Sequence, residues 1–197
     1  MSVWRIGATC MFLGMAVVSI RLSAAEDSPP PTPAPPVATG ETTAKDSGAQ
    51  GSNTREAMCL MIESAAKAAD LPLEFFSRVI WQESRFQADA LGPVTRNGER
   101  AQGIAQFMPG TADERRLLDP FDPVQALPKS AEFLSELRRQ FGNLGLAAAA
   151  YNAGPRRVRE WIEGTGSMPA ETRNYVLAIT GATVDDWKNG SDHVPAR

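Results

Sequence analysis

The sequence predicts a small all-α domain, and three observations support that fold class. From residue 55 onward, apolar side chains recur at the spacing of helices. No segment alternates apolar and polar residues with the period of two that indicates a half-buried strand. Glycines and prolines interrupt the helical pattern repeatedly. We therefore expect a single globular domain of about seven short helices over residues 55–197.

The first 54 residues are expected to precede this domain without joining its core. Residues 1–25 combine a basic start, an apolar run and small residues that close on Ala25, which is the pattern of a secretory signal peptide. The apolar run over residues 6–20 is shorter than the roughly 20 residues that cross a bilayer, so we expect no stable membrane insertion after processing. Residues 26–54 are rich in Pro, Thr, Ala, Gly and Ser and predict a disordered linker. The mature chain would then be periplasmic or secreted.

Composition argues against several classes of function. The formal net charge of −3 does not suit nucleic-acid binding. The one histidine, His193, lies near the C-terminus, so the chain lacks the parts of a His-centred triad or of a zinc site with several imidazoles. Cys59 would be the only cysteine of a processed chain. We therefore expect no metal, no cofactor and no internal disulfide, and acid–base chemistry must fall to carboxylates.

Capping residues and prolines delimit the expected helices. Asp122, followed by Pro123 and by Gln125 as a capping-box partner, opens a helix that stops at Gly142. Asn143 can cap the short apolar helix that follows it. In chain order, the pattern predicts helices over residues 56–69, from Pro72 to Glu83, 122–141, 144–151, from Pro155 past Trp161, and about 170–179.

The spacing is helical in both of the first two helices. In the first, Leu60, Met61, Ser64 and Ala68 recur at helical spacing. In the second, the apolar stripe consists of Phe75, Phe76, Val79, Ile80 and, unusually for an acid, Glu83. A carboxylate on an apolar face is short of water, which disfavours its charged form and raises its pKa. Glu83 is therefore a candidate general acid, unless it pairs with Arg78 or Arg85 or lies at the edge of the apolar stripe.

Four motifs follow one another along the chain. They read Ile-Trp-Gln-Glu-Ser-Arg-Phe at residues 80–86, Gly-Ile-Ala-Gln-Phe-Met-Pro-Gly-Thr-Ala at 103–112, Ala-Tyr-Asn-Ala-Gly-Pro at 150–155 and Pro-Ala-Glu-Thr-Arg-Asn-Tyr-Val at 169–176. In this order and approximate spacing they resemble the lytic transglycosylase domain of the soluble lytic transglycosylase family, which is related in fold to goose-type lysozyme. The resemblance covers roughly residues 56–180 and implies a lysozyme-like, all-α fold.

The resemblance implies roles for individual residues. The Glu of the family's Glu-Ser pair is the catalytic acid and base, which is Glu83 in this chain. The family's substrate-binding positions correspond to Ser84, Gln106, Met108, Tyr151, Asn152, Glu171 and Tyr175. Structural alternatives stand beside three of them: Tyr151 as a core residue, Met108 as gap filling and Gln106 as a cap of its turn. Trp81, one position off the apolar stripe, could stack on a sugar or cover the helix surface.

The resemblance also implies a reaction, the cleavage of peptidoglycan glycan strands with one carboxylate and no cofactor. Glu83 would protonate the glycosidic oxygen between N-acetylmuramic acid and N-acetylglucosamine while the 2-acetamido group assists departure. The carboxylate would then take the proton of the sugar's own 6-hydroxyl as it attacks, leaving a 1,6-anhydro end. Ordinary glycosidases use a second carboxylate instead.

The chain departs from the family's pattern before the second motif. Residues 91–102 are longer than the family's short turn, and Asn97 and Arg100 fall where its Ser and Gly would be. No role is carried over to this loop, which we expect to reshape one end of the cleft. Ile104 and Ala105 replace the family's Leu-Met, a change expected to widen the floor of the cleft.

Two other functions stay open on the sequence alone. A hydrolase like goose-type lysozyme would need a second acid, for which Asp89 is the nearby candidate. A non-catalytic peptidoglycan-binding module is the other, although the intact pair of Glu83 and Ser84 argues against it. The linker and the long loop also leave open a partner in a secretion system or another envelope complex.

Overall fold

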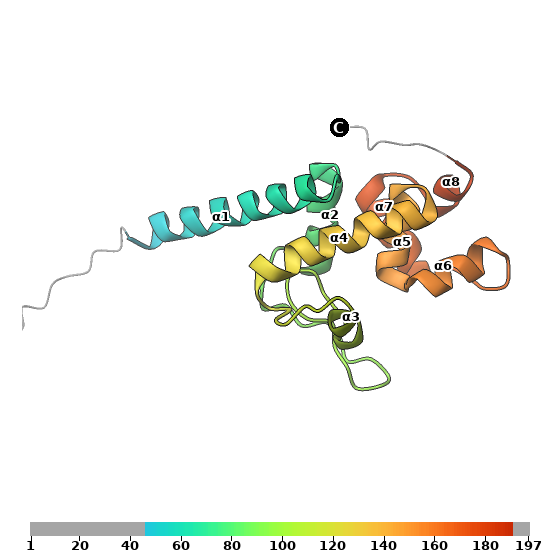
Figure 1. Cartoon of the computed structure of the whole chain (residues 1–197), viewed down its shortest axis with the longest axis horizontal. Helices are drawn as coiled ribbons and strands as arrows, with labels where there is room; N and C mark the ends of the chain where they lie inside the picture. Colours follow the sequence, from blue (N-terminus) through green and yellow to red (C-terminus); the bar gives the residue numbers. More distant parts are fainter. Residues whose placement is uncertain (1–45, 191–197) are drawn as a thin grey trace, which may run out of the picture. The chain divides into compact units, whose positions relative to one another are not determined.

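The structure is a computed structural model that describes residues 46–190, with the backbone alone described for residues 46–52. The expected signal peptide over residues 1–25, and the linker as far as residue 45, lie outside the described residues. The described part contains helices and two isolated β-bridges but no strand, which confirms the all-α fold class. Figure 1 shows its helices, which are α1 (Asp46–Ala68), α2 (Leu73–Ser84), α3 (Pro109–Glu114), α4 (Pro123–Phe141), α5 (Leu144–Ala153), α6 (Pro155–Ile162), α7 (Ala170–Thr180) and α8 (Val184–Lys188).

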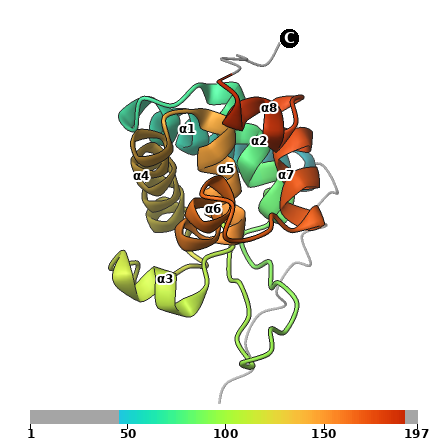
Figure 2. The same ribbon diagram turned by 90° about the vertical axis from the view of Figure 1, so that its right-hand side faces the viewer.

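Helix α5 lies at the centre of the domain and packs against α4, α6, α7 and α8 (Figure 2). Its short side chains allow this, because residues 147–150 are four alanines without exposed surface. Asn143 caps the helix as predicted: its side chain accepts a hydrogen bond from the Leu146 N–H at 2.8 Å and donates to the Trp187 carbonyl at 3.0 Å. The cap of α5 therefore also fastens α8 to the central helix.

Helix α2 buries one face and ends in a strained turn. Its residues without exposed surface are Phe75, Phe76, Val79 and Ile80. This confirms the predicted apolar stripe, which packs toward α1 and α7. The helix stops because Arg85 and Phe86 adopt left-handed backbone conformations, with φ of 57° and 65°. Each costs about 1 kcal/mol in a residue with a side chain, so the surrounding packing must hold this turn in place directly after Glu83.

Helix α4 begins at the predicted residue but with a different cap. One carboxylate oxygen of Asp122 accepts a hydrogen bond from the Val124 N–H at 2.9 Å, and the other accepts one from the Gln125 side-chain amide at 2.9 Å. Gln125 thus bonds the Asp122 carboxylate instead of the Asp122 backbone N–H that a capping box requires. Gly142, with φ of 88°, ends the helix as predicted.

Three helix positions differ from the prediction. Helix α1 begins at Asp46, so residues 46–54 are helical where a disordered linker was expected. The physical reason is that extending an existing helix costs far less than starting one. Helices α3 and α8 were not predicted, since each is short and has little periodicity of its own. Within residues 46–190, none of the helices is both long and apolar enough to cross a membrane.

The buried face of α1 does not coincide with its four residues at helical spacing. Ile62, Ala65 and Ala66 are buried, whereas Leu60 is 60% exposed and Ser64 is exposed. Of the four residues at helical spacing, Met61 packs against the core. The buried face is centred elsewhere because alanines occupy several neighbouring positions of this helix. Spacing alone does not separate two adjacent faces when both carry small residues.

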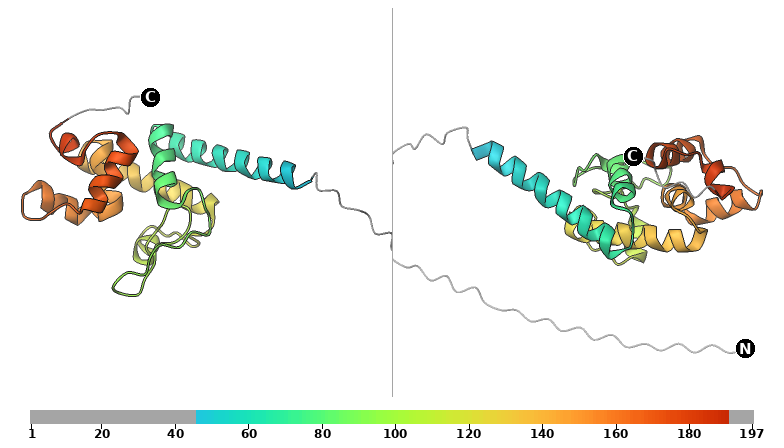
Figure 3. Two further views of the ribbon diagram at one scale, coloured as in Figure 1. Left: turned by 180° about the vertical axis from the view of Figure 1, so that it is seen from behind. Right: turned by 90° about the horizontal axis from the view of Figure 1, so that it is seen from above.

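Residues 91–102 form an ordered hairpin between α2 and α3, called the hairpin below. At its base the Gly92 N–H donates to the Ala101 carbonyl at 2.9 Å, beside an isolated bridge between Leu91 and Gln102. Near its tip the Thr95 N–H donates to the carbonyl of residue 99 at 2.8 Å. Figure 3 shows this segment projecting from the helical body. The loop that departs from the family's pattern is therefore a structured projection.

Gly145 offers a test of the close packing around α5. A Cβ atom at this position would lie 2.0 Å from the Trp187 ring, far inside van der Waals contact. We expect Gly145→Ala to displace α8 and to lower the free energy of unfolding by about 1–3 kcal/mol, as measured by denaturant titration. Gly110→Ala is the matched control, because a Cβ atom there meets nothing within 4 Å. Equal stability of the two variants would contradict the close approach of α5 and α8.

Candidate active site

A cleft of about 880 Å³ is lined by the end of α2, the hairpin, the end of α5 and one face of α7. This is the size of pocket that holds a small organic ligand. Its lining contains two carboxylates, Glu83 and Glu171, and no Lys or Arg. The lining residues are Gln82, Glu83, Pro93, Thr95, Ala101, Gln106, Met108, Tyr151, Asn152, Glu171, Asn174, Tyr175 and Ala178.

The carboxyl group of Glu83 has a strongly raised pKa. Its value rises from 4.5 to about 7, chiefly because burial removes the water that would solvate the charge. The hydrogen bond from Tyr175 opposes this rise, and the nearby charge of Glu171 adds a smaller rise. The direction agrees with the expectation from the apolar stripe. A carboxyl with this pKa can both donate and accept a proton near neutral pH.

Neither neighbouring arginine of α2 forms an ion pair with Glu83. Arg78 Nη2 lies 2.6 Å from Glu74 Oε1, one turn earlier on the same helix. The Arg85 guanidinium lies 4.8 Å from the centre of the Trp81 ring, in a cation–π contact. The alternative in which Glu83 only balances one of these arginines is therefore excluded.

The two tyrosines of the chain both belong to the cleft. Tyr175 Oη donates to Glu83 Oε1 at 2.5 Å, whereas Tyr151 Oη donates to the Ala105 carbonyl at 2.8 Å. Burial, and after it the charge of Glu83, raises the pKa of both phenols well above 10. Both therefore stay protonated near neutral pH. Tyr151 both packs against the core and lines the cleft. Its interpretation as a core residue is therefore compatible with its interpretation as a substrate-binding residue.

Gln106 holds the segment that leads to Met108. Its backbone is left-handed, with φ of 50°, and its Nε2 donates to the carbonyls of Ala90 at 3.1 Å and Gly103 at 2.8 Å. The side chain thus bonds the chain before it, including the Gly103 carbonyl in the turn that precedes Pro109. Because both amide protons face backbone carbonyls, the Gln106 Oε1 atom is left to accept a hydrogen bond from a ligand.

A side-chain hydrogen bond ties α5 to α7 at the cleft. Thr172 Oγ1 donates to Asn152 Oδ1 at 2.8 Å. With that oxygen engaged, the Asn152 amide N–H groups are the part that can donate to a ligand. The face that α7 presents to the cleft consists of Glu171, Asn174, Tyr175 and Ala178.

Three residues considered from the sequence lie outside the cleft lining. Ser84 is buried, its Oγ donates to the Ile80 carbonyl at 3.3 Å, and it is not among the residues that line the cleft. The residue next to Glu83 is turned by about 100° around the helix. Trp81 is 46% exposed, with its ring centre 5.4 Å from that of Phe86. Asp89 is exposed, so the second carboxylate of the cleft is Glu171 and not Asp89.

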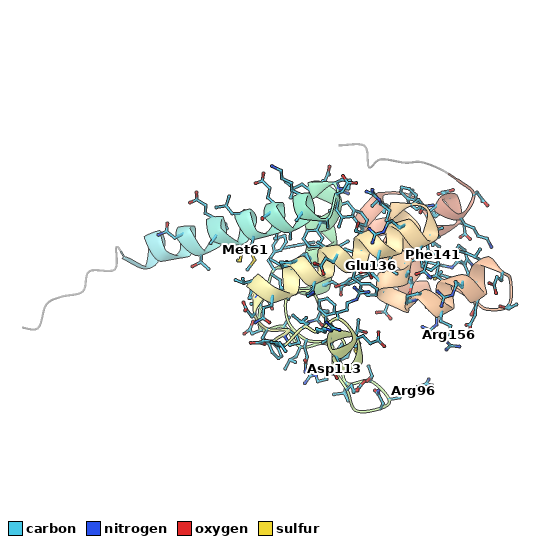
Figure 4. The ribbon with its side chains drawn as sticks, viewed as in Figure 1. Met61, Arg96, Asp113, Glu136, Phe141 and Arg156 are labelled. Atoms are coloured by element: carbon cyan, nitrogen blue, oxygen red, sulfur yellow. The ribbon has the colours of Figure 1, made fainter. Side chains whose placement is uncertain are left out.

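Some cleft residues were missed by comparing motifs. The hairpin contributes Pro93, Thr95 and Ala101. Nothing in the motifs pointed to them, because the position of this segment depends on hydrogen bonds between backbone atoms. Asn174 could have been found, since it lies one helical turn after Glu171, whereas Gln82 is adjacent to Glu83 and no helical spacing pointed to it. Figure 4 shows Arg96 at the tip of the hairpin, away from the helices.

Fold and site together define a lysozyme-like, all-α domain with one perturbed glutamate in a polar cleft. The chain belongs to the family described as the transglycosylase SLT domain, whose family model matches residues 60–174. The resemblance inferred from the four motifs is thereby confirmed.

Relatives of this chain are larger proteins. The soluble lytic murein transglycosylase of Escherichia coli (strain K12) is 31% identical, and the match covers 56% of this chain and 20% of that protein. The corresponding protein of Salmonella typhimurium is 34% identical, with 47% and 18% covered. The chain thus spans about a fifth of the length of these curated relatives.

Solved structures show the same relationship. The X-ray structure of an inactive mutant of the lytic transglycosylase Slt from Pseudomonas aeruginosa is 33% identical, with a TM-score of 0.52, over 61% of this chain and 22% of that one. The 70-kDa soluble lytic transglycosylase from Escherichia coli is 26% identical, with a TM-score of 0.53, over 66% and 23%. Both matches support the assignment of the domain to this family.

The raised pKa of Glu83 predicts that stability depends on pH. The carboxyl ionises near 4.5 in the unfolded chain and near 7 in the folded one, so between these values only the folded state holds the proton. Stability therefore falls as the pH rises through this window, by up to about 3 kcal/mol. Glutamine does not ionise, so Glu83→Gln escapes this loss. Its free energy of unfolding minus that of wild type should therefore be larger at pH 8 than at pH 4.5, by up to about 3 kcal/mol, as measured by denaturant titration at both pH values.

Glu74→Gln is the control for this measurement. Glu74 lies on the same helix, and its side chain is 51% exposed. This variant removes a carboxylate that lies outside the cleft, so it measures what the loss of one negative charge from α2 does to stability at each pH. If the difference between Glu83→Gln and wild type did not depend on pH, the raised pKa of Glu83 would be contradicted.

Proposed function

We propose that this domain is a lytic transglycosylase that cleaves the β-1,4 bond between N-acetylmuramic acid and N-acetylglucosamine in peptidoglycan. The observation that carries this proposal is a carboxyl with a pKa of about 7, hydrogen-bonded by Tyr175, in a cleft that holds a ligand-sized volume. Membership of the SLT family supports the class of reaction. The names of the relatives, soluble lytic murein transglycosylases, support the substrate.

A single essential carboxylate fits what is described for one relative. The Pseudomonas aeruginosa structure is of an inactive mutant in which one glutamate is replaced by glutamine. In this chain we assign the corresponding chemistry to Glu83, because its raised pKa lets it act as an acid and then as a base. The other cleft carboxylate, Glu171, is exposed.

The first step of the proposed reaction is protonation of the leaving group. Protonated Glu83 gives its proton to the glycosidic oxygen, and the bond from that oxygen to the anomeric carbon breaks. The oxygen of the 2-acetamido group bonds to the anomeric carbon as the leaving oxygen departs. The hydrogen bond from Tyr175 stabilises the carboxylate that forms, because it favours the charged state of Glu83.

The second step closes the anhydro ring. The 6-hydroxyl oxygen of the same sugar bonds to the anomeric carbon and displaces the acetamido oxygen. Its proton passes to the Glu83 carboxylate, which restores the starting acid. The products are a free 4-hydroxyl on N-acetylglucosamine and a 1,6-anhydro-N-acetylmuramic acid end, and no water is consumed. The enzyme needs no cofactor for these proton transfers.

The remaining cleft residues are proposed to position the sugar. Asn152 can donate through its amide N–H groups, and Gln106 can accept through Oε1. Met108 and Tyr151 provide apolar surface beside these polar groups. The charge of Glu171 favours positive charge on the anomeric carbon as the bond breaks.

The proposed substrate lies outside the cytoplasmic membrane, so the proposed function requires export. The secretory signal peptide expected over residues 1–25 agrees with this requirement. We therefore propose a periplasmic or secreted location and a glycan strand as the principal binding partner.

A glycan hydrolase is the second candidate, and one observation favours it. Glu171 lines the cleft, and its charge acts on Glu83. A carboxylate in such a position can orient a water molecule for attack on the anomeric carbon. The two functions differ in their products, because hydrolysis leaves reducing ends and transglycosylation leaves anhydro ends.

Digestion of purified peptidoglycan separates these candidates. We expect mass spectrometry to find 1,6-anhydro-N-acetylmuramic acid ends, and reducing ends alone would replace the proposal by hydrolysis. Glu83→Gln should lower the rate by at least about 100-fold, because it removes the general acid. Glu74→Gln, on the same helix and outside the cleft, should keep wild-type activity. Full activity of Glu83→Gln would contradict the assigned role.

The pH dependence of the rate tests the state of Glu83. Cleavage requires the protonated carboxyl, so the rate should fall as the pH rises through about 7. Tyr175→Phe removes the hydrogen bond that lowers the pKa of Glu83. Its pH–rate profile should therefore have a descending limb at higher pH than wild type. A limb at the same or lower pH would contradict the role of Tyr175.

A further inference from the structure

Ser130 is a buried polar residue on α4 that the proposed reaction does not use. It has no exposed surface, and its Oγ is the one buried side-chain oxygen or nitrogen without a hydrogen-bond partner in the described part of the chain. A buried hydroxyl left unbonded costs about 1–3 kcal/mol. An alanine at this position would avoid that cost, so the hydroxyl needs an explanation.

The residue beside Ser130 on the neighbouring helix is Tyr151. Phe133, three residues after Ser130 on α4, has its ring centre 5.4 Å from that of Tyr151. Residues three apart share one face of a helix, so Ser130 also faces α5. Burial and the charge of Glu83 raise the pKa of Tyr151, whereas the nearby Ser130 hydroxyl lowers it. Both observations indicate that the Ser130 side chain lies near the Tyr151 phenol, although the structure shows no hydrogen bond from its Oγ.

The phenol of Tyr151 can still accept a hydrogen bond. Its one proton is donated to the Ala105 carbonyl at 2.8 Å, and its oxygen keeps acceptor capacity. As long as that proton points to Ala105, Tyr151 cannot donate to Glu83. The hydrogen bond that Glu83 accepts comes from Tyr175.

We propose that Ser130 is a positioning residue, whose hydroxyl donates to Tyr151 Oη and keeps the Tyr151 proton on the Ala105 carbonyl. A donor that has itself accepted a hydrogen bond binds its own acceptor more strongly. The chain from Ser130 through Tyr151 to Ala105 therefore joins α4 to the segment before Gln106. It also fixes the direction in which Tyr151 donates.

The direction of that proton matters for Glu83. A second hydrogen bond from Tyr151 would stabilise the carboxylate and make Glu83 a stronger acid that has lost its proton at neutral pH. Ser130 keeps the hydroxyl proton of Tyr151 directed at the Ala105 carbonyl. Tyr175 is then the one tyrosine that donates a hydrogen bond to the Glu83 carboxyl. This kinetic consequence rests on the proposed function, whereas the hydrogen bond itself does not.

The hydrogen bond can be tested without any substrate, because the chain has only two tyrosines. Protein labelled with ¹³C at tyrosine Cζ gives two NMR signals, and Tyr175→Phe identifies the one from Tyr151. We expect Ser130→Ala to move the Tyr151 signal and Ser130→Thr, which keeps a hydroxyl, to return it toward the wild-type position. A Ser130→Ala spectrum identical to that of wild type would overturn the proposal.

Ser135→Ala is the matched control. Ser135 is also buried on α4, and its Oγ accepts a hydrogen bond from Arg139 at 3.0 Å. This variant should leave the Tyr151 signal in place. A shift as large as that of Ser130→Ala would show a general response to serine removal and would overturn the specific role. Thermal unfolding of each variant establishes that the folded proteins are compared.

Kinetics on purified glycan strands test the positioning role. Ser130→Ala should lower kcat by about fivefold with little change in KM. The descending limb of its pH–rate profile should lie at lower pH than that of wild type. Wild-type kcat together with a wild-type pH profile would overturn that role. Inactivity of the wild-type protein would instead overturn the proposed function and leave the NMR result standing.

Discussion

The burial of one carboxylate is the constraint on which the rest of the structure depends. Glu83 is the penultimate residue of α2, and the apolar stripe of that helix fixes it at the cleft. Its proton is retained near neutral pH only where water and positive charge are scarce. The cleft meets both conditions, because Glu83 is desolvated and no Lys or Arg is among the lining residues.

The site is assembled from the ends of helices that meet around α5. Tyr151 and Asn152 lie in the last turn of that central helix, Glu83 lies in the last turn of α2, and Glu171 opens α7. Hydrogen bonds between these ends, such as the one from Thr172 to Asn152, carry the alignment from the core to the cleft. The relative placement of these helix ends therefore depends on the close packing of the four helices around the alanine-rich α5.

The sequence was most informative where one physical signal dominates. The spacing of apolar residues in α2 predicted both the helix and the position of Glu83 on its apolar face, because a strongly amphipathic pattern has one buried face. The family motif pairs Ser84 with Glu83, but Ser84 lies outside the cleft lining, since adjacency along the chain does not mean adjacency around a helix. The buried face of α1 could not be predicted because its small residues carry little periodic signal, and residues 91–102 depend on backbone hydrogen bonds that no residue type specifies.

The hairpin closes upon itself from the pair of Gly92 and Ala101 at its base to Thr95 near its tip. None of the hydrogen bonds made by Glu83, Tyr151 or Tyr175 involves it. The hairpin contributes to the site through Pro93, Thr95 and Ala101, which line the cleft. Exchange of this one segment would therefore change a wall of the cleft while leaving the donors of the hydrogen bonds to Glu83 and Ala105 on α7 and α5.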